Sequence, residues 1–149
     1  MGSLTLPSSG TVYVDANAVI YGVERIEPYN NLLLPLWRGA QAGNYSIVSS
    51  DLLLLETLVK PIREDNVVLE ASFRTLLLAS NEIRLTPITI PILEHAARLR
   101  ATTKLKTPDA IHAATALALG CNLFVTNDRD LARVPELPVA VLSDIVLLS

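Results

Sequence analysis

Short runs of β-branched and aromatic residues alternate along this chain with longer segments of helical periodicity, and this alternation constrains the fold more than any other feature. Strands that alternate with helices are typical of a parallel sheet. We therefore expect an α/β fold: a three-layer α/β/α sandwich with a central, mostly parallel sheet of about five short strands. The expected strands span residues 11–14, 46–48, 83–85, 123–126 and 138–142, the last at an edge.

Capping residues and prolines predict where the helices begin and end. Pro35 lies inside the second helix and either kinks it or shifts its start, and Pro61 is expected to end the third. Thr89 and Thr107 are expected N-caps, and Gly120 is an expected helix stop. The predicted helices span residues 17–23, 28–42, about 51–60, 66–80, about 90–103 and 108–119.

The length of 149 residues suits a single domain, and half of the residues are hydrophobic, enough for a sizeable core. The small polar residues 1–10 are expected to be flexible, and they lack the basic and apolar regions of a secretory signal. The richest apolar run, 110–125, is too short and too often interrupted by polar residues for a membrane span. The one cysteine, Cys121, excludes an internal disulfide and fits a reducing compartment, so a cytoplasmic protein is expected.

The net charge of −3 argues against a module that holds nucleic acid only through phosphates, because such modules are usually basic. An enzyme stays possible, since bound metal would neutralise a local acidic cluster. The leucine-rich stretches at 32–34, 52–55 and 76–78 are interpreted as core. A dimer face is the alternative, because a small domain has a limited interior, and a homodimer is expected.

Three acidic residues are expected to meet at one edge of the sheet. Asp15 follows the first strand and Asp128 lies just past the fourth, at the carboxyl ends where open α/β sheets bind ligands. The helix that carries Asp109 in its first turn feeds the fourth strand and must run antiparallel to it, so that turn lies at the same edge. A helix N-terminus favours an ionised carboxylate. An aspartate after Thr-Pro is also an ordinary helix start, and this structural interpretation stays open.

Glu56 cannot be placed by strand order. It lies about two turns into its helix, at roughly 1.5 Å per residue. Its neighbours from Leu52 to Val59 are almost all apolar, and a lone acid in such a setting is costly unless it has a partner. Either the helix leans across the carboxyl edge of the sheet, or Glu56 lies on a solvated stripe.

Four segments resemble, in order and spacing, the motifs of PIN domains. They are residues 14–21 (Val-Asp-Ala-Asn-Ala-Val-Ile-Tyr), 55–56 (Leu-Glu), 107–116 (Thr-Pro-Asp-Ala-Ile-His-Ala-Ala-Thr-Ala) and 124–131 (Phe-Val-Thr-Asn-Asp-Arg-Asp-Leu). The resemblance covers nearly the whole chain, so residues 1–149 are expected to form a single PIN-like domain. Among PIN proteins the compact size is most similar to the VapC toxins of toxin–antitoxin pairs.

The resemblance implies a metal-dependent endoribonuclease that hydrolyses RNA phosphodiester bonds. Carboxylate oxygens are hard ligands, which suit Mg²⁺ or Mn²⁺ and make zinc improbable. Asp130 is the alternative fourth acid or an outer ligand, although Asp128 lies nearer the strand end. The implied catalytic and metal-binding residues are Asp15, Glu56, Asp109 and Asp128, with Asn17 and Thr126 as candidate supports.

Substrate RNA would be held by scattered basic residues. Arg129 is the expected phosphate contact, and Lys104 and Lys106, with Arg98 and Arg100, form either a basic lip or a solvated helix face. An antitoxin protein is the expected partner and would cover the acidic pocket.

Neither histidine is required as a base, because a metal ion can activate the attacking water. His112 lies one turn after Asp109 and is interpreted as a helix-packing residue, and His95 as a surface residue. Three alternative functions stay open: a PIN ribonuclease of RNA processing or decay without an antitoxin, a catalytically silent RNA-binding PIN module, and a DNA-directed nuclease of related fold.

Overall fold

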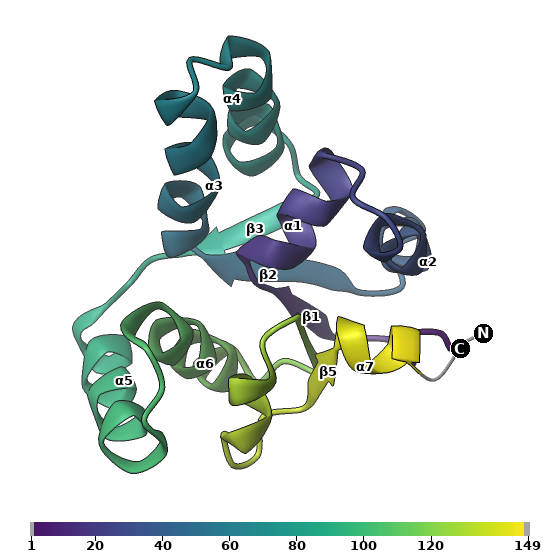
Figure 1. Cartoon of the computed structure of the whole chain (residues 1–149). Coiled ribbons are helices and arrows are strands. Elements are labelled where there is room, and N and C mark those ends of the chain that lie inside the picture. Colours follow the sequence, from purple (N-terminus) through teal and green to yellow (C-terminus); the bar gives the residue numbers. More distant parts are fainter. Residues whose placement is uncertain (1, 148–149) are drawn as a thin grey trace.

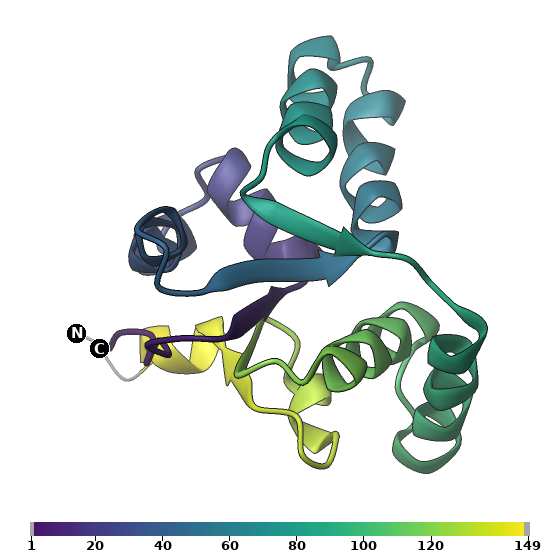
Figure 2. The same ribbon diagram turned by 180° about the vertical axis from the view of Figure 1, so that it is seen from behind.

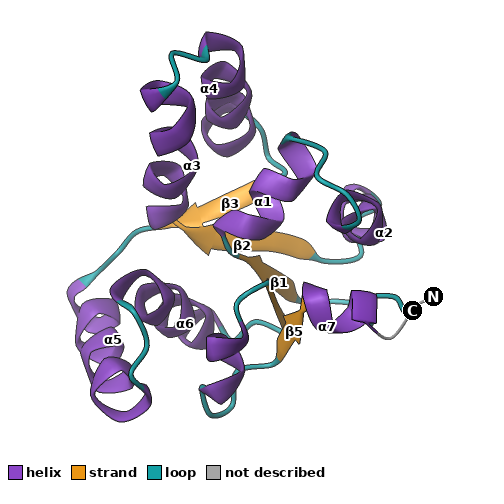
Figure 3. Ribbon diagram, in the orientation of Figure 1, coloured by secondary structure: helices purple, strands orange, loops and turns teal. Residues whose placement is uncertain are grey.

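The computed structural model describes residues 2–147 as a three-layer α/β/α sandwich around one parallel sheet (Figures 1 and 3). The strands lie in the order β3-β2-β1-β4-β5, and every neighbouring pair is parallel. They are β1 (Thr11–Val14), β2 (Ser46–Ser50), β3 (Ile83–Thr86), β4 (Leu123–Thr126) and β5 (Val139–Val141). The α-helices are α1 (Ala16–Val23), α2 (Tyr29–Gln41), α3 (Leu52–Arg63), α4 (Val67–Arg74), α5 (Ile90–Thr103), α6 (Thr107–Leu119) and α7 (Leu142–Leu147).

Each face of the sheet has its own hydrophobic core. Helices α1 to α4 cover one face and α5 and α6 the other, and the short segment between β3 and α5 carries the chain across (Figure 2). Successive side chains of a strand point to opposite faces. In β1, Val12 and Val14 therefore pack with the first group of helices, while Tyr13 packs with α5 and α6. Leu4, in the segment that we expected to be flexible, is buried in the first core.

Most predicted element boundaries are confirmed, and two are wrong. Helix α3 runs past Pro61 to Arg63. Pro61 lies in the last turn of the helix, where its missing N–H forgoes one hydrogen bond of the helix, and its ring is buried. Thr107 is the first helical residue of α6 rather than its cap, since Lys106 has the extended backbone of an N-cap. The predicted helix over 66–80 is α4 followed by a π-helical turn, Thr75–Ala79.

Strand order places a ligand-binding edge at the centre of the sheet. The chain leaves β1 for β2 and β3 on one side, and returns to add β4 and β5 on the other side of β1. The direction of winding therefore changes between β1 and β4, and open α/β sheets bind ligands at the carboxyl ends of strands at such a point. Asp15 and Asp128 follow these two neighbouring strands. None of the helices in residues 2–147 combines the length and apolar composition needed to cross a bilayer.

Candidate active site

Asp15 is a buried carboxylate fixed by hydrogen bonds at the junction of β1 and α1. Its Oδ1 accepts the backbone N–H of Ala18 at 3.3 Å and so caps α1, and its Oδ2 accepts the hydroxyl of Thr126 at 2.5 Å. Only 6% of the Asp15 surface is exposed. Burial raises the pKa of Asp15, and the hydrogen bond from Thr126 opposes that rise. The β1 terminus therefore holds one oriented carboxylate close to the solvent edge.

Thr126, at the end of β4, connects Asp15 to Asp128. Its fully buried hydroxyl donates to Asp15 and accepts the backbone N–H of Asp128 at 3.0 Å. A hydroxyl has one donor and can accept as well, so this single side chain orients two acids at once. The supporting role that we predict for Thr126 rests on these two contacts.

Asp109 and Asp128 form a pair of interacting carboxyl groups. Asp109 lies in the first turn of α6, and its carboxyl group is within hydrogen-bonding reach of that of Asp128. Burial, this hydrogen bond and repulsion from Asp128 and Asp15 raise the pKa of Asp109 to about 7. Two carboxyl groups at such a short distance keep one proton between them near neutral pH unless a cation replaces it.

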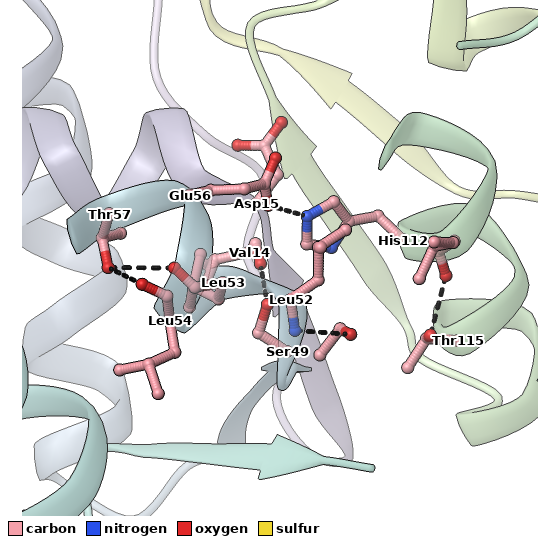
Figure 4. A network of polar contacts seen from close by, with 12 residues as sticks. Val14, Asp15, Ser49, Leu52, Leu53, Leu54, Glu56, Thr57, His112 and Thr115 are labelled. Atoms are coloured by element: carbon pink, nitrogen blue, oxygen red, sulfur yellow. Dashed lines mark hydrogen bonds and ion pairs between the residues drawn. The ribbon is translucent and has the colours of Figure 1, made fainter. Parts of the chain in front are cut away.

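Glu56 reaches the same edge from α3 and is held there by His112 of α6. The Glu56 Oε1 lies 2.5 Å from His112 Nε2, and Figure 4 shows the two side chains meeting beside Asp15. His112 is buried, with 2% of its surface exposed, and its Nδ1 lies 2.7 Å from the hydroxyl of Tyr13. Of the two positions open to Glu56 from sequence, the structure therefore shows the one at the carboxyl edge.

The carboxylate of Asp130 pairs with a basic residue and not with the acids of this cluster. Asp130 lies on the 3₁₀ turn Arg129–Arg133, and its carboxylate pairs with Arg133 at 2.7 Å with half of its side chain exposed. Its backbone N–H donates to Asp128 at 2.9 Å. Asp130 thus helps to orient Asp128 through its main chain, while its own carboxylate is engaged elsewhere.

Replacing Asp130 by Asn is expected to leave the nuclease activity that the resemblance implies within about twofold of wild type, because its carboxylate pairs with Arg133 and not with the acidic cluster. Replacing Asp128 by Asn is expected to lower activity at least about tenfold, since it removes a charge from the interacting pair. Initial rates of RNA cleavage measure both effects. The reverse order of effects would make Asp130 the fourth acid.

The basic residues lie at the rim, and only some of them are free to contact a substrate. Lys104 and Lys106 are exposed in the connection that leads into α6, next to the turn that carries Asp109. Arg100 instead donates through Nε to the carbonyl of Leu105 at 2.9 Å. Arg129 is paired with Asp144 at 2.6 Å, so an RNA phosphate would have to compete with that carboxylate.

Asn17 is exposed in the first turn of α1, and no hydrogen bond of its side chain occurs in the described part of the chain. The supporting role of Asn17 therefore stays a prediction, because no hydrogen bond of its side chain supports it. His95, on α5, is half-buried.

The donors at the cluster fit a hard divalent cation in chemistry. They are carboxylates, and repulsion from Asp128 and Asp15 adds to burial in raising the pKa of Asp109. Within residues 2–147 no three His, Cys, Asp or Glu side chains converge on one metal position as they stand. Magnesium usually binds through one or two carboxylates and keeps several waters, so the interacting pair and the neighbouring Asp15 suffice for such a site.

Tyr13 and His112, which are linked to the cluster through Glu56, are not among the site residues predicted from the sequence. The sequence predicts His112 to be a helix-packing residue, and it is buried in α6; its position one turn after Asp109 is the signal that also brings it to the cluster. Tyr13 gave a weaker signal, because an aromatic residue in a buried strand is ordinary core.

The chain is a parallel α/β protein with an acidic candidate site at the central carboxyl edge of its sheet. Sequence comparison identifies its family. The PIN domain family model matches residues 12–137, and the chain belongs to this family. No curated protein matches the sequence.

Solved structures with the same fold include toxins. VapBC2 from Rickettsia felis, bound to a DNA fragment from its promoter, has 17% identity and a TM-score of 0.69, and the alignment covers 88% of this chain and 98% of that chain. A toxin–antitoxin complex from Klebsiella pneumoniae has 24% identity and a TM-score of 0.64, with 87% and 96% covered. VapC20 from Mycobacterium tuberculosis, a sarcin–ricin loop cleaving toxin, has 16% identity and a TM-score of 0.64, with 76% and 86% covered. The fold predicted from sequence, PIN-like and most similar to VapC toxins, is confirmed.

Proposed function

We propose that this protein is a metal-dependent endoribonuclease and the toxin of a type II toxin–antitoxin pair. The observation that carries the proposal is the convergence of Asp15, Asp109 and Asp128 at the carboxyl edge, where burial, the hydrogen bond to Asp128 and repulsion from both acids raise the pKa of Asp109 to about 7. Carboxylates held against their mutual repulsion are unfavourable unless a cation is their partner. Membership of the PIN domain family and the fold of VapC20, described as a cleaving toxin, support the same function.

Asp15, Asp109 and Asp128 would hold Mg²⁺ or Mn²⁺, with Glu56 at the side of the same cluster. When bound, such an ion activates a water and neutralises the charge that develops on phosphorus. Thr126 keeps Asp15 and Asp128 in place through its two hydrogen bonds. Asp109 gains from its position in the first turn of α6, where the helix dipole stabilises its ionised form.

Exposed cations beside the cluster would contact the RNA backbone. Lys104 and Lys106 lie next to the first turn of α6, and Arg129 follows Asp128. Phosphate contacts position a nucleic acid without reading its sequence. These three residues would therefore set affinity, while choice of the cleaved site rests with other contacts.

An antitoxin protein is the proposed partner, and the surface of α3 supports one. Leu55, Val59 and Ile62 are 63%, 48% and 51% exposed, and they lie at helical spacing on one face beside Glu56. On α4, Val67 and Val68 are more exposed still. Contiguous exposed apolar side chains are typical of protein interfaces. The similar structure from Klebsiella pneumoniae is described as a toxin–antitoxin complex.

A homodimer is the second proposed assembly. The leucine-rich stretches are largely core, since Leu33, Leu53 and Leu77 are buried. Leu55 and Leu78 of the same stretches are more than half exposed and could serve an interface.

Purified protein is expected to cleave a circular single-stranded RNA in the presence of Mg²⁺ or Mn²⁺ and to be inactive in EDTA. A circular substrate has no ends, so only an endonuclease can open it. Asp109→Asn is the matched variant, because it removes one charge at almost constant volume. A circular DNA of the same sequence tests the substrate class. Lack of cleavage by the wild type with either metal, or full activity of Asp109→Asn, would reject the proposed function.

A further inference from the structure

Tyr13, His112 and Glu56 form a continuous polar chain that begins in the core and ends at the acidic cluster. Tyr13 is fully buried in β1, His112 is buried in α6, and Glu56 on α3 retains 24% of its side-chain exposure. The hydroxyl of Tyr13 lies 2.7 Å from His112 Nδ1, and His112 Nε2 lies 2.5 Å from Glu56 Oε1. This chain of hydrogen bonds therefore connects β1, α6 and α3 through the imidazole ring of His112.

The carboxylate of Glu56 fixes the direction of the hydrogen bonds in this chain, because an ionised carboxylate can only accept. Ser49 donates its hydrogen to the carbonyl of Val14 at 2.6 Å, and Thr115 donates to the carbonyl of Ile111 at 2.7 Å (Figure 4). Both side chains lie near the Tyr13 hydroxyl, and with their hydrogens engaged neither donates to it.

Nε2 of His112 therefore carries the hydrogen that it donates to the carboxylate of Glu56. Nδ1 of the neutral imidazole is then the acceptor, and the hydroxyl of Tyr13 donates to it. Burial raises the pKa of Tyr13, which keeps the tyrosine in its donating form.

We propose that Tyr13 and His112 are positioning residues that hold the Glu56 carboxylate at the acidic cluster. The proposal rests on the proposed nuclease function. Glu56 has a flexible side chain on a helix whose neighbouring residue, Leu55, points to solvent, and it is repelled by Asp15. Without a fixed donor, the carboxylate gains hydration by turning outward, away from the cluster. The Nε2–H group of His112 offsets both the repulsion from Asp15 and the gain in hydration. Residues that hydrogen-bond to metal-binding side chains orient them in the same way in other proteins.

A packing role alone does not explain this geometry. A histidine that only filled space would not have both ring nitrogens engaged by side chains from two other elements. The ring also meets Tyr13 edge to face, with centroids 5.7 Å apart and planes at 75°, so rotation of the imidazole would break both hydrogen bonds and this contact.

The first test needs no metal and no activity. The chain has two histidines, and a long-range ¹H–¹⁵N spectrum of the whole metal-free protein resolves them. His112 is expected to show the Nε2–H tautomer, and Tyr13→Phe is expected to shift the His112 signals while leaving those of His95 unchanged. An Nδ1–H tautomer at His112, or no response to Tyr13→Phe, would overturn the hydrogen-bonded chain.

The second test measures catalysis. His112→Leu is expected to lower kcat for RNA cleavage about tenfold, and Tyr13→Phe several-fold, with KM unchanged, as for other partners that orient a site. His112→Gln places an amide N–H near the former Nε2 and is expected to recover most of the loss. Thr57→Val is the control, because it removes a buried hydroxyl from α3 that bonds only to the carbonyls of Leu53 and Leu54.

These outcomes separate the two proposals. An inactive wild type rejects the nuclease function, while the spectrum still decides whether the hydrogen-bonded chain exists. An active wild type with unchanged kcat in Tyr13→Phe and His112→Leu rejects the positioning role. Equal losses in Thr57→Val and His112→Leu, or no recovery in His112→Gln, would also reject it, because general disturbance of the packing would then account for the effect.

Discussion

Asp15→Asn is expected to lower metal-dependent RNA cleavage by about a thousandfold, the equivalent of roughly 4 kcal/mol in the activation free energy. Asp15 is the most deeply buried acid of the cluster and lies at the carboxyl end of β1, next to β4. Loss of its charge removes a metal ligand and weakens the stabilisation of the phosphorus centre. The measurement is the initial rate of cleavage of circular RNA with saturating Mn²⁺.

The same substitution is expected to preserve the fold, which separates a catalytic effect from misfolding. The amide oxygen of Asn can still accept a hydrogen bond, and the neutral side chain no longer repels Asp109. Thermal unfolding of the metal-free variant is therefore expected at the wild-type Tm or above it. Asp51→Asn is the matched control, because Asp51 is an exposed aspartate at the start of α3 without a side-chain cap.

In cells, expression of the wild type is expected to arrest growth, and Asp15→Asn to relieve the arrest. A variant that stays within tenfold of wild-type activity would exclude Asp15 from the reaction. If Asp15→Asn arrests growth as strongly as the wild type, RNA cleavage is not the cause of the growth arrest.

The fold was predictable because its signals are local. Five short β-rich runs separated by helical patterns leave few topologies other than a parallel sheet. The two wrong boundaries, at Pro61 and Thr107, arise where packing or backbone geometry overrides a residue preference. Pro61 is tolerated because its ring is buried near the end of α3, which no local pattern reveals.

The site was predictable in part, since topology alone brings Asp15, Asp109 and Asp128 together. Each follows a strand or starts a helix at the carboxyl edge of the sheet. Glu56 was placed by family resemblance, because a residue in the middle of a helix has no position fixed by strand order. Its contact with His112 joins residues 56 positions apart, and such a pairing depends on how α3 and α6 meet.

Binding of Mn²⁺ to the metal-free protein is expected to strengthen about thirtyfold between pH 5.5 and pH 8.0, if one proton with a pKa near 7 must leave. Burial, the hydrogen bond to Asp128 and repulsion from neighbouring acids raise the pKa of Asp109 to about 7 from 3.8. Below pH 7 the pair holds a proton that the metal has to displace, and above pH 7 the dependence flattens. Calorimetric titrations at several pH values, in buffers of different ionisation enthalpy, measure both the affinity and the released proton.

The free energy of unfolding of the metal-free protein is expected to fall as pH rises, whereas the affinity for Mn²⁺ rises. A carboxyl group whose pKa is higher in the folded state binds protons more tightly there than in the unfolded chain, so its contribution to stability is lost as pH rises from about 4 through 7. Asp109→Asn removes this group, and the difference in Tm between wild type and variant isolates its share from that of other acids. The variant is expected to bind Mn²⁺ more weakly and with little pH dependence. Equal pH dependence of Mn²⁺ binding in wild type and Asp109→Asn would show that the proton displaced by the metal belongs to another group.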